Sequence, residues 1–507
     1  MIYNFNLGIG WASSGVEYAQ AYRAKVLKNL KVKAKFFFSD MFRTDNIEHM
    51  TKNIGLDDDQ VVWLYQYFTD YDTEPCSYPV SELEESFGDA EYKTTPDKNR
   101  IQYSFPEENR FVNVYLSSVD KTMAQRVEYV VGGYLIRTDY YSSGKIFSEF
   151  FVPRDGEARV CSRRFYNRDG KVAYEEFIDE NEKEKEKEGE SIFRFPDRIY
   201  YSKEELMAAV VDDIDFLPED VVIADRTTLW GQPVFRHHKP AKLCIVLHAE
   251  HYSTSITDEH HILWNNYYEY VFDHADKVDT FITSTDIQNK TLKEQLEKYG
   301  NVQPHIVTIP VGALDKLRKP EAGRKPFAVL TTSRLASEKH VDWIAKAVIR
   351  AREAVPELTL DIYGTGGEEK KIREIIKDAK AEDYIRLMGH KNMDERYKDY
   401  SAYIAASTSE GFGLTLMEAV GSGLPMIGYD VPYGNQTFIA DGENGYLLTV
   451  DREEEGPEEM VEKLVNGLVR LFTEADLKAF EKKSYQIAEP FLSKHIEEKW
   501  MRLVEGK

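Results

Sequence analysis

The chain has 507 residues, of which 42% are apolar and 13% aromatic, and it carries a formal net charge of −23. This length exceeds what a single hydrophobic core organises, and the apolar content excludes a chain that is disordered throughout. So strong a negative charge disfavours a broad nucleic-acid-binding surface.

The N-terminal part alternates between strand and helix patterns, as in a parallel α/β domain. Strands are predicted at Ile2–Leu7 and Lys35–Phe38, on either side of a helix over about Val16–Leu30. The alternation stops after Asp70 and resumes near residue 204. The second run has predicted helices at Glu204–Val211, Ile262–His274 and Gln288–Tyr299, and predicted strands at Val221–Ala224, Leu243–Leu247 and Thr280–Thr283.

The interruption, residues 74–195, has a period of two and is rich in tyrosine, phenylalanine and valine. Turn signals at Ser143-Gly144, Asp155-Gly156 and Asp169-Gly170 divide it into hairpins, because aspartate and glycine tolerate the positive φ of tight turns. We therefore predict an antiparallel β-meander inserted into the first α/β domain. The alternating Lys/Glu run at 182–190 is interpreted as a solvated loop.

A second α/β domain is predicted after a linker at Val311–Lys325. Its strands are expected at Phe327–Thr331, Leu358–Tyr363, Ile385–Met388, Ala402–Ala405 and Pro425–Tyr429, and Leu477–Val504 is expected to be helical. The predicted division is 1–73 and 199–312 for a first Rossmann-like domain on the acceptor side, 74–198 for the insertion, 313–484 for a second Rossmann-like domain, and 485–507 for a C-terminal helix returning towards the first. Two such domains facing a cleft suit a ligand at the carboxyl ends of their strands.

Two glutamates eight residues apart, Glu410 and Glu418, form the strongest candidate motif. Glu410 lies in a glycine-flanked loop after a predicted strand, and Glu418 lies inside the following helix. Gly411 and Gly413 let a ligand approach the backbone closely, and the helix N-terminus favours a pyrophosphate. The alternative is an ordinary strand–loop–helix connection with surface glutamates.

Two cations, Arg334 and Lys339, follow the strand pattern at Ala328–Thr332. At this spacing after a strand we expect them to face one phosphate cavity and to neutralise the charge on a departing diphosphate. Taken alone, they are equally well explained as solvated charges at the start of a helix. Together with Glu410 and Glu418 they favour a site for a nucleotide-diphosphate sugar.

These motifs, with the pair Gly364 and Gly366 after a strand, resemble the large family 4 of retaining GT-B glycosyltransferases over about residues 327–448. The resemblance implies that Arg334 and Lys339 contact the diphosphate, Glu418 the ribose, and Glu410 the sugar or the diphosphate region. The donor site on this side then also includes the following residues: Glu338, His390, Lys391, Gly411, Phe412, Gly413 and Leu414. In this set the backbone at His390 and Lys391 holds the base.

A narrower resemblance covers essentially the whole chain. Leu7–Tyr18, the hairpin-rich insertion and His248–Tyr252 are similar to the glycosyltransferase A family of serine-rich-repeat adhesins, part of the accessory Sec system of Gram-positive bacteria. This implies transfer of N-acetylglucosamine from UDP-GlcNAc, with retention, to Ser or Thr of the adhesin polypeptide as the first step of its O-glycosylation. It also implies a hetero-oligomer with a homologous non-catalytic stabilising subunit docked through the meander. Donor contacts are implied for five further residues: Gly15, Val16, Glu17, Tyr18 and His248.

Reasoning from the residues supports this N-terminal site in part. Gly15 opens a helix, which suits a diphosphate or the reacting sugar. Gly8-x-Gly10 is followed by Ser13 where a dinucleotide fingerprint needs its third glycine, so a dinucleotide is disfavoured. His248 ends an apolar strand at its carboxyl edge, where ligands bind. A lone histidine is more often structural, but this position and the resemblance favour a contact with the donor sugar.

No cofactor and no metal are expected. Arg334, Lys339 and helix dipoles can neutralise the diphosphate, and the Asp-x-Asp pairs at 70–72 and 213–215 lie outside the donor motifs. We expect front-face transfer, in which the β-phosphate of the departing UDP takes the acceptor proton; Glu410 as a covalent nucleophile is the other option.

Three alternatives remain at this point. The donor could be UDP-glucose, on the same adhesin. The acceptor could be the poly(glycerol-phosphate) of teichoic acid, although that polyanion should favour a basic surface. The chain could be a non-catalytic binding subunit, which should have lost the donor motifs.

The expected location is cytoplasmic, with peripheral contact at the inner face of the cell membrane left open. The first residues lead into a strand pattern without a basic or apolar targeting segment, and no apolar run approaches the ~20 residues of a membrane span. Cys76, Cys161 and Cys244 are far apart and form neither a disulfide framework nor a zinc motif, and Cys244 is expected to be a buried thiol.

Overall fold

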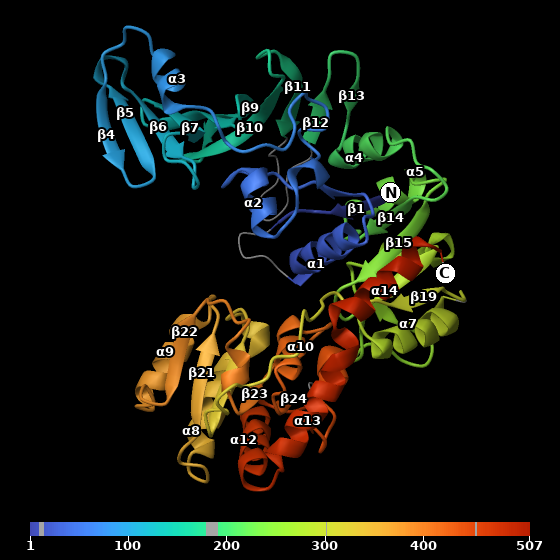
Figure 1. Cartoon of the computed structure of the whole chain (residues 1–507). Coiled ribbons are helices and arrows are strands. Elements are labelled where there is room, and N and C mark those ends of the chain that lie inside the picture. Colours follow the sequence, from blue (N-terminus) through green and yellow to red (C-terminus); the bar gives the residue numbers. More distant parts are fainter. Residues whose placement is uncertain (10–14, 179–190, 301, 452–453, 507) are drawn as a thin grey trace. The chain divides into compact units, whose positions relative to one another are not determined.

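The computed structural model describes the whole chain except residues 10–14, 179–190, 301, 452–453 and 507 (Figure 1). The chain divides into two compact units, residues 1–17 with 32–244 and residues 18–31 with 245–507. The boundary passes through helix α1 (Gly15–Asn29) and strand β15 (Lys242–Leu247). The predicted Lys/Glu loop at 182–190 lies outside the described residues. The five-segment domain division stays a prediction.

A seven-stranded sheet has the order β19-β18-β15-β14-β1-β2-β3. The first unit contributes four strands that pair in parallel: β1 (Ile2–Asn6), β2 (Ala34–Phe38), β3 (Val61–Trp63) and β14 (Val221–Ala224). Its helices outside the insertion are α2 (Ile47–Asn53), α4 (Lys203–Asp212) and α5 (Gly231–His237). Every residue of β14 is buried, as expected of a parallel strand covered on both faces. Cys244 in β15 is buried, as predicted.

Between β3 and β14 the chain forms the predicted antiparallel insertion, a sheet with the order β13-β12-β11-β10-β9-β8-β7-β6-β5-β4 (Figure 1). The strands are β4 (Lys93–Asp97), β5 (Arg100–Phe105), β6 (Arg110–Leu116), β7 (Ala124–Val131), β8 (Tyr134–Tyr141), β9 (Lys145–Arg154), β10 (Glu157–Tyr166), β11 (Val172–Ile178), β12 (Ser191–Arg194) and β13 (Ile199–Tyr200). Helix α3 (Val80–Glu85) packs on β5 to β7, where its Val80 and Leu83 join a buried apolar cluster.

The predicted turns lie at the predicted hairpins, but their backbones differ. Asp155 and Gly156 both have positive φ, 53° and 80°, as a two-residue turn between twisted strands requires. At the third hairpin only Gly170 has positive φ, 78°, although aspartate and glycine both tolerate this region. The Asp169 carboxylate instead accepts from the Lys171 N–H at 2.9 Å, which fixes a longer loop.

In the second unit the strand–helix alternation continues with β18 (Thr280–Thr283), α7 (Asp286–Tyr299) and β19 (Ile306–Thr308). The helix predicted over Ile262–His274 is wrong for most of its length: β17 (Leu263–Trp264) pairs with β16 (Tyr252–Ser253), and only α6 (Glu269–Asp273) is helical. The Asn265 side chain accepts from the Tyr267 N–H at 3.1 Å and donates to the Glu250 carbonyl at 3.0 Å. Such local bonds compete with helix formation.

A second parallel sheet has the order β22-β21-β20-β23-β24-β25. Its strands are β20 (Ala328–Thr332), β21 (Thr359–Tyr363), β22 (Ile385–Gly389), β23 (Ala402–Ile404), β24 (Met426–Tyr429) and β25 (Gly445–Leu448). Side chains alternate between two buried clusters: Val329 joins one cluster and Leu330 the other. Helices α8 (Val341–Ala351), α9 (Glu369–Asp378) and α12 (Pro457–Thr473) contribute to the first cluster, and α10 (Leu414–Gly421) to the second. The sheet is therefore covered by helices on both faces.

The C-terminal stretch is helical, but it is not one continuous helix. α13 (Leu477–Ala488) and α14 (Ser493–Val504) are separated by a short turn that contains Pro490. Proline has no backbone N–H and disfavours helical geometry at the residue before it, so it ends the first helix. A short helix, α11 (Gly434–Phe438), completes the secondary structure that is relevant to the site.

Candidate functional site

Lys339 and Glu410 form a direct ion pair, with Nζ donating to Oε2 at 2.8 Å. Lys339 lies on a short turn, Ser337–Lys339, that follows β20, and Glu410 lies between β23 and α10. The two side chains are only 17% and 20% exposed. Gly413, with φ of 83°, is the residue before α10 and allows the chain to turn into that helix. The structure thus brings together two residues that lie 71 positions apart in the sequence.

The loop that carries Glu410 also contacts the segment that follows β15. A Cβ built on Gly411 would lie 2.4 Å from the His248 carbonyl oxygen, so only glycine fits this approach. The Ser409 hydroxyl donates to the Glu250 carboxylate at 3.2 Å. His248 follows the last residue of β15, as its predicted place at a carboxyl edge requires.

Glu418 lies in α10, where the Tyr397 hydroxyl donates to its Oε2 at 2.8 Å. Burial raises the pKa of Glu418 to about 7, and the nearby Asp394 carboxylate acts in the same direction. Glu418 faces a cavity of about 200 Å³, whose lining also includes Tyr22, Arg318 and Asp394. This cavity is large enough for part of a small ligand, and it offers carboxylate, phenol and guanidinium groups.

Arg334 and Glu338 form a more exposed pair beside Lys339, with Nη2 to Oε1 at 3.2 Å and side chains 56% and 47% exposed. The backbone after β21 packs closely on this segment, because a Cβ on Gly364 would lie 1.8 Å from the Ser333 carbonyl oxygen. His390 and Lys391 are exposed in the turn directly after β22. These residues gather at the carboxyl ends of neighbouring strands, the edge at which ligands of α/β sheets bind.

Gly15, Val16, Glu17 and Tyr18 form the first turn of α1. Val16 and Glu17 are buried, whereas Tyr18 is 44% exposed. Residues 10–14, which precede them in the sequence, lie outside the described residues.

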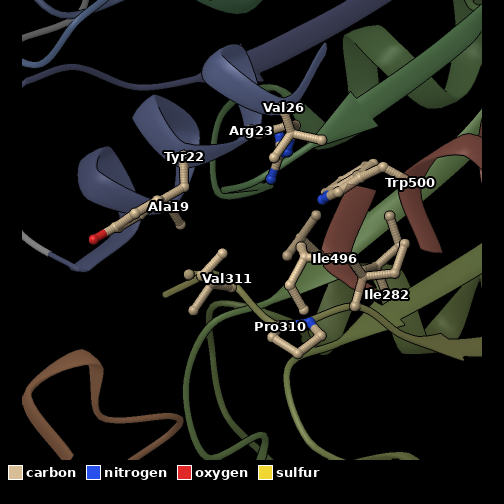
Figure 2. A pocket seen from close by; sticks show the side chains of 13 residues that line it. Ala19, Tyr22, Arg23, Val26, Ile282, Pro310, Val311, Ile496 and Trp500 are labelled. Atoms are coloured by element: carbon tan, nitrogen blue, oxygen red, sulfur yellow. The ribbon is translucent and has the colours of Figure 1, made fainter. Parts of the chain in front are cut away.

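Figure 2 shows a second, much smaller cavity between α1 and α14, lined by Tyr22, Val26, Ile496 and other largely apolar side chains. Its volume is about 10 Å³, and the Arg23 guanidinium lies 5.2 Å from the centre of the Trp500 ring at this place. A space of this size holds at most one water molecule, so it is a packing feature and not a ligand site.

Among the residues that the structure describes, no three His, Cys, Asp or Glu side chains are grouped so that they could hold a metal ion. Within the same residues no helix is both long enough and apolar enough to cross a membrane.

Sequence reasoning missed two tyrosines that hold the site. Tyr397 bonds Glu418, and Tyr433 bonds the backbone of Glu410, with its N–H 2.7 Å from the Glu410 carbonyl. Both side chains are fully buried. Tyr397 lies in the charged segment 392–400 and Tyr433 lies between Pro432 and Gly434. Neither setting gives a local sign of a long-range hydrogen bond, so no pattern in the sequence distinguishes the two tyrosines.

Two family models match the chain: the GtfA extended beta-sheet domain over residues 93–197 and glycosyl transferases group 1 over residues 315–472. The GtfA subunit of UDP-N-acetylglucosamine–peptide N-acetylglucosaminyltransferase from Streptococcus pneumoniae serotype 4 is 50% identical over 504 residues, 99% of each chain. A crystal structure of the pneumococcal O-GlcNAc transferase GtfA in complex with UDP and GlcNAc has a TM-score of 0.92 and 50% identity, covering 100% of this chain and 98% of that one. A crystal structure of a GtfA/B complex contains a chain with a TM-score of 0.91 and 46% identity, covering 100% of this chain and 99% of that one.

Two parallel α/β sheets, the long antiparallel insertion and charged residues at the carboxyl ends of the strands define a glycosyltransferase of the GT-B type. Identity of 50% over nearly the full length of both chains specifies it further. The chain belongs to the family of GtfA subunits.

Proposed function

We propose that this protein transfers N-acetylglucosamine from UDP-GlcNAc, with retention of configuration, to Ser and Thr hydroxyls of a serine-rich-repeat adhesin. This reaction is the first step of the adhesin's O-glycosylation, and the protein performs it in a hetero-oligomer with a homologous, non-catalytic partner. The name of the 50%-identical pneumococcal relative, a UDP-N-acetylglucosamine–peptide N-acetylglucosaminyltransferase subunit, supports the donor and the acceptor class. The crystal structure of pneumococcal GtfA with UDP and GlcNAc supports the donor. The GtfA/B complex supports the partner.

The observation that carries the proposal is the Lys339–Glu410 ion pair at 2.8 Å. Glu410 lies in a glycine loop that precedes the N-terminus of α10, and the segment of His248 packs against the same loop. A cation, a carboxylate and a helix N-terminus at one place suit a sugar diphosphate, whose leaving group gains negative charge during transfer.

In the proposed reaction the bond between the anomeric carbon and the diphosphate oxygen breaks, and a bond from that carbon to the acceptor hydroxyl oxygen forms on the same face. The acceptor proton goes to an oxygen of the departing UDP β-phosphate. Lys339 and Arg334 stabilise the charge on the diphosphate, and the Glu410 carboxylate stabilises positive charge on the sugar ring. Glu418 accepts a hydrogen bond from a ribose hydroxyl, and the backbone at His390 and Lys391 binds the uracil base.

The remaining donor contacts are proposed for Gly15 to Tyr18 at the start of α1, for His248, for Glu338 and for residues 411–414. A metal ion is not part of the proposal, because fixed cations and helix N-termini provide the positive charge. A cytoplasmic location, with peripheral contact at the inner face of the membrane, also belongs to the proposal.

The test measures transfer from UDP-GlcNAc and from UDP-glucose to a Ser/Thr-rich repeat polypeptide, with and without the partner subunit, and in the presence of EDTA. We expect sugar on the polypeptide from UDP-GlcNAc, more of it with the partner, and no loss with EDTA. A parallel reaction contains a glycerol-phosphate polymer as the acceptor. Consumption of UDP-glucose on that polymer, with no sugar on the polypeptide, would replace the adhesin function with the teichoic-acid one.

A further inference from the structure

The segment after β15 is joined to the Glu410 loop by a side chain with no role in the proposed reaction. His251 is completely buried, and both of its ring nitrogens have a hydrogen-bond partner. Nε2 lies 2.8 Å from Gln295 Oε1, and Nδ1 lies 3.0 Å from the Tyr433 hydroxyl. The His251 and Tyr433 rings are also stacked, with their centres 5.7 Å apart and their planes 13° from parallel.

These partners fix the tautomer of His251. An amide oxygen only accepts, so Nε2 carries the proton and donates to Gln295, and Nδ1 is left to accept from the Tyr433 hydroxyl. Burial lowers the pKa of His251 to about 4, so the ring is neutral near pH 7. In this state the His251 ring orients the Tyr433 hydroxyl, and the side-chain amide of Gln295, on α7, holds the opposite edge of the His251 ring.

Tyr433 is in turn hydrogen-bonded to the backbone of Glu410. The N–H groups of Tyr433 and Gly434 both donate to the Glu410 carbonyl, at 2.7 and 2.8 Å. Gly434 is also pressed against the loop, because a Cβ built there would lie 2.1 Å from the Phe412 carbonyl oxygen. A movement of the Tyr433 ring therefore moves the backbone that carries the Glu410 carboxylate.

We propose that His251 is a positioning residue, which sets the place of the Glu410 carboxylate through the Tyr433 hydroxyl and thereby controls the rate of sugar transfer. The inference rests on the proposed role of Glu410 in transfer. It predicts a loss in kcat with little change in UDP binding, because His251 contacts Gln295 and Tyr433 and not the groups assigned to the ribose and the diphosphate. Small displacements of a catalytic group can reduce turnover strongly.

The first test replaces Tyr433 with phenylalanine, which removes one hydroxyl and keeps the stacked ring. Tyr429→Phe is the matched control, since Tyr429 is equally buried and its hydroxyl donates to the Met460 carbonyl at 2.9 Å, a bond that does not involve the loop. With UDP-GlcNAc, the repeat polypeptide and the partner subunit, we expect Tyr433→Phe to lower kcat about 10-fold or more and the control about twofold or less. The Kd for UDP should stay within about twofold in both variants.

A second pair of variants separates positioning from general stability. In His251→Asn the amide occupies the place of Nδ1 and can accept from Tyr433; in His251→Gln it occupies the place of Nε2 and can reach only Gln295. The asparagine variant leaves the larger cavity and should be the less stable of the two. We nevertheless expect it to keep several-fold more of the wild-type kcat than the glutamine variant.

Equal kcat values for the two His251 variants, or a higher one for glutamine, would overturn the inference. So would a Tyr433→Phe enzyme with the kcat of Tyr429→Phe. A wild-type protein that transfers no sugar to the polypeptide would instead contradict the proposed function, so the two failures are distinct. Adding Tyr433→Phe to His251→Gln should cause no further loss of kcat, because both changes remove the hydrogen bond between the Tyr433 hydroxyl and residue 251.

Discussion

The exchange of Glu410 for glutamine should separate donor binding from transfer. The Lys339–Glu410 pair at 2.8 Å has a gross Coulomb attraction of about 6 kcal/mol at an effective dielectric constant of about 20. Both side chains are about four-fifths buried, so desolvation offsets most of this, and we expect a net stabilisation of about 1 kcal/mol. Glutamine keeps the size of the side chain and an acceptor for Lys339, but it removes one negative charge beside the proposed diphosphate site.

We therefore expect Glu410→Gln to lose about 1 kcal/mol in the free energy of unfolding, to bind UDP as tightly as the wild type or up to about 5-fold more tightly, and to transfer sugar about 10²–10³-fold more slowly. Lys339→Met should change the affinity for UDP in the opposite direction, weakening UDP binding about 10-fold or more. Titration calorimetry with UDP and a transfer assay with UDP-GlcNAc measure the two effects. Parallel losses of UDP binding and of transfer in Glu410→Gln would refute the assignment of its charge to the sugar.

Three further predictions concern the fold and the second carboxylate. Gly411→Ala should lower the free energy of unfolding by about 1–3 kcal/mol, measured by chemical denaturation, and reduce transfer, since the added methyl group would lie 2.4 Å from a backbone oxygen. Gly367→Ala is the control and should leave stability unchanged, because its methyl group would have no neighbour within 4 Å. The folded-state pKa of Glu418, about 7, lies above its unfolded value of about 4.5, so its contribution to stability is complete below pH 4.5 and is lost as the pH rises through 7. In the wild type the free energy of unfolding should therefore fall by up to about 3 kcal/mol over that range, and Glu418→Gln should remove this fall. A variant with the pH profile of the wild type would contradict this. Arg163→Met should lose about 3–5 kcal/mol in the free energy of unfolding, because it removes the guanidinium that lies 2.9 Å from each of two buried glutamates, Glu149 and Glu176, and leaves, among the described residues, only Arg43, 4.0 Å from Glu149. A loss below about 1 kcal/mol would show that the network contributes little.

The candidate site was predictable where its residues follow strand patterns. Glu410, Lys339 and His248 each come shortly after an apolar run, and the carboxyl ends of parallel strands meet at one edge of a sheet. The same reasoning fails at Asn265, where an apolar-aromatic stretch predicts a helix although the asparagine side chain accepts from the Tyr267 N–H and donates to the Glu250 carbonyl. It also predicts a helical C-terminal stretch without the interruption at Pro490.

The sequence by itself determined the periodicities, and with them two parallel α/β sheets, the antiparallel insertion and the loops that carry the charged residues. Those features depend on neighbours within a few residues, so local patterns record them. Only the tertiary structure decided which loops meet: that Lys339 pairs with Glu410, that Tyr397 bonds Glu418, and that His251 reaches the Glu410 loop through Tyr433. Such contacts join residues far apart in the chain, so they follow from the packing of complete elements and not from any local pattern. Burial in those elements then raises the pKa of Glu418 and lowers that of His251.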